Sequence, residues 1–151
     1  MSAQVVSSKF WEVRLPDEWA LKDQEIEHTT YVEAPDGSQG VYVSTWRDSR
    51  RPLLTAMQEA RAVERRNLPH AGNGSWEVLQ STENDGPSCI ELLSEYLNLA
   101  ATYRIVSRML GRDDCYVRLT YHDYDCKDLA FSIERAEPWV RSLSLRAAES
   151  P

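Results

Sequence analysis

The feature that most limits the fold of this 151-residue chain is a series of short segments in which apolar and polar residues alternate. A period of two places the apolar side chains on one face of a strand, and turn-forming residues such as those at 85–87 and 111–113 separate the segments. Because the connections are short, consecutive strands should pair antiparallel. The expected strands cover residues 10–15, 25–33, 40–46, 76–81, 89–97, 102–110 and 115–122.

Two other segments have the spacing of amphipathic helices. The first begins at Pro52, which suits a first helical turn, and should end before Pro69 because the residue preceding a proline resists helical geometry. The second follows Asp125 as a candidate cap and carries apolar residues at spacings of four and three up to Leu143, with Pro138 as its weak point. This order predicts an α+β domain, an antiparallel sheet with two main helices packed on it.

Length and composition indicate one domain. A chain of this size buries roughly 70% of the surface it exposes when unfolded. The hydrophobic content is 42%, and no apolar run approaches the roughly 20 residues of a membrane-spanning helix, so membrane insertion is not expected. We expect a single domain over residues 10–146, with flexible ends at 1–9 and 147–151, where the residues are small and polar.

Charge and cysteine content limit the partners and the compartment. The chain has 24 acidic and 17 basic residues and a net charge of -7, which disfavours binding to nucleic acid. Its three cysteines are an odd set without close spacing, which is typical of a reducing compartment. The N-terminal residues lack an export signal, so the expected location is the cytoplasm.

The sequence contains no nucleophile elbow and no phosphate-binding glycine loop, and we expect neither an enzyme nor a cofactor. Cys115, His122 and Cys126 are residue types that bind zinc, but the odd spacing of Cys115 and His122 on one strand points them to opposite faces, so no metal is expected. The alternative is a small enzyme or ligand-binding protein with a pocket near His122, where Asp123 and Asp125 would shift the pKa of the imidazole.

One face of the strands at 89–97 and 102–110 carries both apolar and charged residues, and we call it the mixed face. A turn at 98–101 predicts three opposed pairs, Glu95 with Arg104, Leu93 with Val106, and Glu91 with Arg108. The following strand extends this face with further apolar residues. Such a face is a solvated sheet face with weak surface ion pairs, a recognition surface, or a face that lies beneath a helix of the same chain. The predicted partner-binding residues are Glu91, Leu93, Glu95, Arg104, Val106, Arg108, Leu119 and Tyr121.

Residues 10–19, FWEVRLPDEW, resemble the opening element of the PsbP-like superfamily, and the segments 116–121 and 139–143 are similar to its last strand and closing helix. The resemblance implies an α/β/α sandwich. The superfamily includes an extrinsic photosystem II subunit, a nuclear Ran-binding protein and the Eag-type chaperones, bacterial cytoplasmic adaptors that hold hydrophobic segments of type VI secretion effectors.

The resemblance therefore implies a non-enzymatic adaptor or chaperone. Its expected partner is another protein, such as a hydrophobic segment of a secreted effector, and a second copy of the chain is the other association considered. No partner-binding residue of the chaperones is matched to a position in this sequence.

Overall fold

The computed structural model describes residues 2–22, 28–69 and 74–147, and all statements about secondary structure refer to these residues. The strands are β1 (Ala3–Ser7), β2 (Trp11–Pro16), β3 (Ala20–Lys22), β4 (Thr29–Glu33), β5 (Gln39–Arg47), β6 (Glu77–Asp85), β7 (Ile90–Asn98), β8 (Tyr103–Arg112), β9 (Cys115–Asp123) and β10 (Ser144–Leu145). The helices are α1 (Leu53–Arg66) and α2 (Leu129–Arg141).

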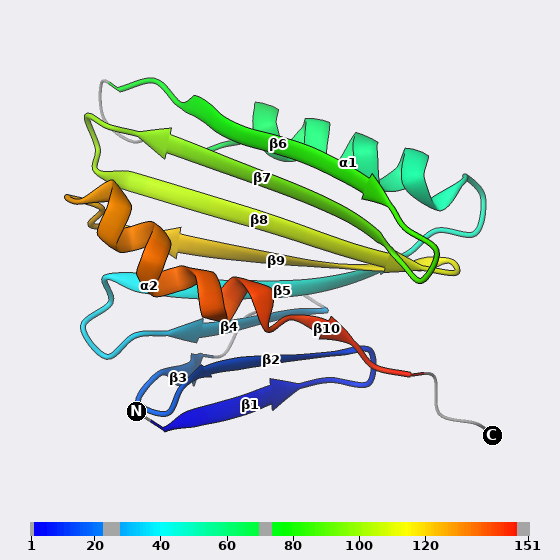
Figure 1. Ribbon diagram of the computed structural model, residues 1–151, viewed down its shortest axis with the longest axis horizontal. Coiled ribbons are helices and arrows are strands. Elements are labelled where there is room, and N and C mark those ends of the chain that lie inside the picture. Colours follow the sequence, from blue (N-terminus) through cyan, green and yellow to red (C-terminus); the bar gives the residue numbers. More distant parts are fainter. Residues whose placement is uncertain (1, 23–27, 70–73, 148–151) are drawn as a thin grey trace.

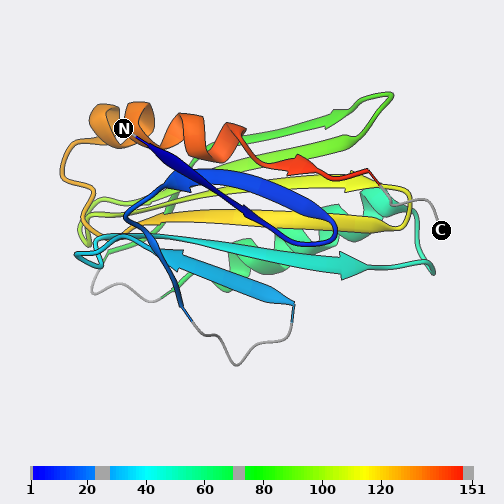
Figure 2. The ribbon, with the colours of Figure 1, turned by 90° about the horizontal axis from the view of Figure 1, so that it is seen from below.

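These elements form three layers (Figures 1 and 2). The middle layer, which we call the large sheet, has the strand order β3-β4-β5-β9-β8-β7-β6, and every pair in it is antiparallel. Helix α1 lies on one face. Helix α2 and the small sheet, of order β1-β2-β10, lie on the other. The predicted class, two helices on an antiparallel sheet, is confirmed.

The small sheet was not expected from the sequence. Residues 1–9, whose composition predicts a flexible segment, contain β1, and this strand pairs with β2 from Ala3 opposite Pro16 onward. The side chain of Gln4 adds hydrogen bonds to the carbonyl oxygens of Pro16 (2.9 Å) and Trp19 (2.7 Å). At the other edge of β2, the two residues of β10 pair with Trp11 and Glu12. Strands this short leave little alternation of apolar and polar residues to detect. The tail at 148–151 lies outside the described residues.

The register of β7 and β8 differs from the predicted one by two residues. Leu97 lies opposite Arg104 and Glu95 opposite Val106, because the turn begins after Asn98 and not before it. The buried Asn98 accepts a hydrogen bond from the Ala101 N–H at 3.2 Å within this turn. A shift of two residues keeps every side chain on its face, so the faces are as predicted although the opposed pairs are not.

The helix ends also differ in detail from the sequence-based expectation. The cap of α2 is Asp128 and not Asp125, and its carboxylate accepts the Phe131 N–H at 3.1 Å. Pro138 lies in the last turn, so α2 continues past it to Arg141 with the loss of one backbone hydrogen bond. Helix α1 begins one residue after Pro52.

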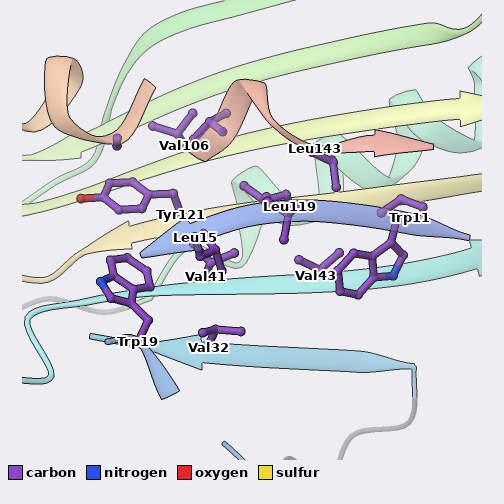
Figure 3. Packing of buried hydrophobic residues seen from close by; sticks show 14 of the residues in the cluster. Trp11, Leu15, Trp19, Val32, Val41, Val43, Val106, Leu119, Tyr121 and Leu143 are labelled. Atoms are coloured by element: carbon purple, nitrogen blue, oxygen red, sulfur yellow. The ribbon is translucent and has the colours of Figure 1, made fainter. Parts of the chain in front are cut away.

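Two hydrophobic clusters fill the spaces between the layers. The larger one joins the small sheet and α2 to the large sheet (Figure 3), and the smaller one lies under α1 around the fully buried Met57. Gly111 allows α1 to come close, since a Cβ at this position would stand 2.5 Å from the Met57 sulfur. The sheet is therefore covered on both faces, by different elements.

Candidate binding cleft

The mixed face predicted as a partner surface is largely interior. Leu119 and Tyr121 have no exposed surface and Val106 retains 7%, because α2 and β2 cover them (Figure 3). Val13 and Leu15 of β2 belong to the same cluster. The prediction of an exposed recognition surface is wrong for these three residues, and cover by the chain's own elements is what the structure shows.

Six of the eight predicted residues, the buried Val106 among them, line a cleft of about 230 Å³ between the large sheet and α2, which we call the α2 cleft. Its floor consists of Glu91, Leu93 and Glu95 of β7 and Arg104, Val106 and Arg108 of β8. The α2 wall consists of Ile133, Ala136, Glu137, Val140 and Arg141, and Gln80 of β6 completes the lining. Figure 1 shows that α2 does not cross β6 and β7, the two strands at one edge of the large sheet.

A buried ion pair forms the inner end of the α2 cleft. Arg104 donates from Nε to Glu95 Oε2 at 2.7 Å and from Nη1 to Ser132 Oγ of α2 at 3.0 Å. Arg104 is 4% exposed and Glu95 8%. Removing two charges from water costs free energy that only good geometry recovers, so we infer that this pair positions α2 more than it adds stability.

The polar network continues beneath α2. Ser132 donates to Asp123 Oδ2 at 2.7 Å, and Arg135 donates to the same oxygen at 3.1 Å. Close by, the Tyr121 hydroxyl donates to Gln39 Oε1 at 2.7 Å, and burial raises the pKa of Tyr121 to about 12. These bonds satisfy most of the charged atoms that the helix covers, as buried polar groups require.

A second ion pair forms the outer end of the cleft. Arg108 donates from Nε to Glu91 Oε2 at 2.7 Å. Its Nη1 donates to the carbonyl oxygens of Val140 (3.0 Å), Arg141 (3.2 Å) and Leu143 (2.9 Å). The last carbonyl groups of a helix lack partners within the helix, and a cation is stabilising there. Arg104 and Arg108 therefore hold the first and last turns of α2 on the sheet.

Between the two ion pairs the cleft is apolar. Leu93 is half-buried and Ile133 is 37% exposed, so a hydrophobic group can reach both side chains. The volume is below the ~300–1,000 Å³ of typical small-molecule sites and suits one or two side chains of a protein segment. The lining as a whole combines this apolar centre with charged side chains of β7, β8 and α2.

His122 lies on the opposite face of the large sheet among aromatic rings. Its Nδ1 is 2.7 Å from the Tyr103 hydroxyl, and its ring centroid is 5.2 Å from that of Tyr42 and 5.6 Å from that of Tyr124. Burial lowers the pKa of His122 to about 4. The imidazole is therefore neutral at pH 7, and its lowered pKa makes it a weak proton acceptor.

The carboxylates expected beside His122 lie elsewhere. Asp123 points toward α2, and Asp125 is exposed and pairs with Lys127 at 3.6 Å. Asp123 follows His122 on β9, so alternation turns its side chain to the other face, and Asp125 lies beyond the end of β9. Among the described residues, no three side chains of His, Cys, Asp or Glu gather in a way that would hold a metal ion.

The three layers and the strand order define an α+β protein of the PsbP-like fold. The solution structure of cyanobacterial PsbP (CyanoP) from Synechocystis sp. PCC 6803 superposes with a TM-score of 0.71 at 12% identity, over 96% of this chain and 93% of that one. A crystal structure from Bacteroides thetaiotaomicron VPI-5482 covers 91% of this chain and 45% of its own, with a TM-score of 0.50 and 13% identity. No protein-family model and no curated protein matches the chain.

In the part of the chain that the structure describes, neither helix is long and apolar enough to span a membrane.

Sequence reasoning missed the helical wall of the α2 cleft. Ile133, Ala136 and Val140 are part of the same apolar spacing that predicts α2, so a signal for them existed. The spacing does not encode which face of the sheet receives the helix, nor how far across the strands the helix extends. The cleft arises from that extent, because α2 stops short of β7.

Proposed function

We propose that the protein is a non-enzymatic adaptor or chaperone that binds a hydrophobic segment of another protein, with an apolar side chain of that segment seated in the α2 cleft. The observation that carries the proposal is the partly exposed apolar strip formed by Leu93 and Ile133 between two ion pairs. Such a centre with a charged border is the usual composition of a protein-binding site.

The direction of approach follows from the edge of the large sheet. Arg61 of α1 donates to the Thr82 carbonyl oxygen of β6 at 2.8 Å and forms an ion pair with Glu83 at 3.6 Å. These contacts occupy part of the β6 edge, which hinders strand addition there. The partner segment would therefore lie across the face of β6 and β7 on the α2 side, and would not extend the sheet.

The border charges would orient the partner. Glu91 is partly exposed beside Arg108, and Glu137 and Arg141 pair at 2.7 Å on the exposed side of α2. Exposed charges at the rim of an interface affect the association rate and the register more than the affinity. A hydrophobic segment flanked by polar residues matches this arrangement, and the sequence resemblance suggests a type VI secretion effector as its source.

The experiment compares two exposed apolar residues of α2. Ile133 lines the cleft, whereas Phe131 is 56% exposed and lies outside the lining. Tagged wild-type protein, Ile133→Asp and Phe131→Asp would be purified gently from the native host at native expression, and the bound proteins identified by mass spectrometry. We expect a partner that is retained by wild type and Phe131→Asp and lost with Ile133→Asp, because a charge would have to be desolvated in the cleft.

Circular dichroism should show all three proteins folded with similar melting temperatures, since both substitutions are at exposed positions. Partners retained equally by wild type and Ile133→Asp, or absent from all three, would refute the cleft as the binding site. If the partner that depends on Ile133 is a second copy of the chain or a protein unrelated to secretion, the effector-binding form of the proposal fails.

A further inference from the structure

A second cavity, separate from the α2 cleft, lies between the large and small sheets. It encloses about 450 Å³ where the β8–β9 turn and the end of β5 meet β10 and the turn before β2, at the right of Figure 1. Four cationic side chains line it, from Lys9, Arg47, Arg112 and Arg146. None of the residues of the α2 cleft contributes to it. We call it the basic pocket.

The strand register brings two of these cations together. Cys115, the first residue of β9, lies opposite Arg47 of β5 on one side and opposite Arg112 of β8 on the other. Directly opposed residues in an antiparallel sheet point to the same face. Arg47 and Arg112 therefore flank the thiol of Cys115 at the wall of the pocket.

The four cations lack direct carboxylate partners among the described residues. Within the described residues, none of the four forms an ion pair, whereas eight other cations do, namely Arg51, Arg61, Arg104, Arg108, Arg118, Lys127, Arg135 and Arg141. Arg112 donates instead to the Arg146 carbonyl oxygen at 2.9 Å, and Arg146 to the Ser8 carbonyl oxygen at 2.7 Å. The guanidinium of Arg47 lies 5.3 Å from the centre of the Phe10 ring.

These contacts fix the guanidinium groups in place without cancelling their charge. Two carboxylates, of Asp113 and Asp114, line the same pocket, so the local balance remains positive in a chain whose net charge is -7. A concave site with one sign of charge concentrates ions of the opposite sign. Arginine in particular matches the geometry of carboxylate and phosphate groups.

We propose that the basic pocket binds a small organic anion, with its carboxylate or phosphate group between Arg47 and Arg112 and its apolar body against Phe10 and Leu145. The cavity volume is within the ~300–1,000 Å³ of small-molecule sites. The inference is independent of the α2 cleft and of any protein partner.

Cys115 serves as the reporter for the test, in a chain that carries Cys89→Ser because Cys89 is also partly exposed and Cys126 is buried. The thiolate of Cys115 attacks an aromatic disulfide reagent, whose S–S bond breaks to leave a mixed disulfide and one released arylthiolate. The rate is measured with dianionic 5,5′-dithiobis(2-nitrobenzoate) and with neutral 4,4′-dithiodipyridine. The same thiolate attacks both reagents, so the ratio of the two rates cancels any change in the pKa of Cys115.

We expect the ratio of anionic to neutral rate to fall about tenfold when Arg47→Gln and Arg112→Gln are combined, because the pocket no longer concentrates the anion. The matched control combines Arg65→Gln and Arg66→Gln, which removes two exposed charges from the last turn of α1 on the opposite face of the sheet. This control should leave the ratio nearly unchanged. An equal ratio in the two double variants would overturn the proposal.

A second measurement needs no arginine variant. Inorganic phosphate, benzoate and phenyl phosphate are each tested, against sodium chloride of equal ionic strength, for slowing the reaction of Cys115 with the neutral reagent. We expect protection by all three, with phenyl phosphate acting at lower concentration than inorganic phosphate because of its apolar ring. If none protects more than chloride, there is no anion site, and if phenyl phosphate is no better than inorganic phosphate, the apolar part of the proposal is wrong.

Discussion

The two faces of the large sheet are closed by different chemistry. On the α2 side, the fully buried Leu119 lies in the same layer as the buried pair of Glu95 and Arg104. On the α1 side, a small apolar cluster surrounds Met57, Glu64 of α1 pairs with Arg118 of β9 at 3.6 Å, and neutral aromatic rings surround His122. The comparison teaches that the first face depends on a buried charge pair that must remain intact, whereas the second depends on packing, on an ion pair with a more exposed arginine and on one unprotonated imidazole.

The largest expected effect comes from placing a charge at the centre of the α2 face. Leu119→Asp would bury an unpaired carboxylate, at a cost of about 4 kcal/mol or more in the free energy of unfolding, comparable to the whole stability of many domains. Urea denaturation followed by circular dichroism would show the loss. Ile133→Asp is the control and should change stability by less than about 1 kcal/mol. A native-like unfolding curve for Leu119→Asp would contradict the cover by α2 and β2.

The next effect tests the paired charges. Arg104→Ala leaves the Glu95 carboxylate buried without its partner and should cost about 3–5 kcal/mol. The double variant Glu95→Leu with Arg104→Met removes both charges and should recover most of that loss, because an apolar pair of similar volume often replaces a buried ion pair without penalty. If the double variant is as unstable as the single one, the ion pair itself stabilises the fold and the comparison between the faces must be revised.

A smaller loss is expected on the α1 face. Met57→Ala removes a fully buried side chain from a cluster without charges, which should cost about 2–4 kcal/mol through lost burial and the cavity left behind. Val63→Ala on the exposed side of α1 is the control, since Val63 is 44% exposed. Equal stabilities of the two variants in urea denaturation would show that α1 contributes little to closing this face.

The smallest effect is the acid sensitivity of the aromatic surface. The pKa of His122 falls from 6.5 in the unfolded chain to about 4 in the folded one, so the unfolded chain binds the proton first as the pH drops. The contribution of His122 to the free energy of unfolding is therefore fully present above pH 6.5. It declines toward pH 4 by up to about 3 kcal/mol. His122→Asn should flatten this decline in urea denaturation between pH 7 and pH 4. Parallel declines in the two proteins would mean that the folded imidazole is not shielded.

The sequence was sufficient to predict which side chains share a face of the sheet, but not which elements of the chain pack over that face. The period of two assigns Leu93, Val106 and Leu119 to one face whatever the register, so a register error of two residues left that assignment intact. Glu95 with Arg104 and Glu91 with Arg108 are joined as expected for the same reason, since diagonal neighbours on one face are within reach of long side chains.

The cover was not predictable because it depends on contacts between distant parts of the chain. β2 has clear alternation, yet nothing in residues 11–16 indicates that this strand belongs to a separate sheet that packs over the large one. The basic pocket was missed for a related reason. Lys9, Arg47 and Arg112 belong to three separated segments, and only the closure of the small sheet over the strand ends brings them to one cavity.

The pairing of β2 with β10 has a consequence for the order of folding. Glu12 lies opposite Ser144, so the layer over Leu119 is completed by residues that a ribosome makes near the beginning and near the end of this sequence. Contacts between such distant residues form late, because loop closure must precede them. During synthesis the strands of the large sheet would thus exist for some time with their most apolar face in water, and this interval is when the chain is most exposed to aggregation.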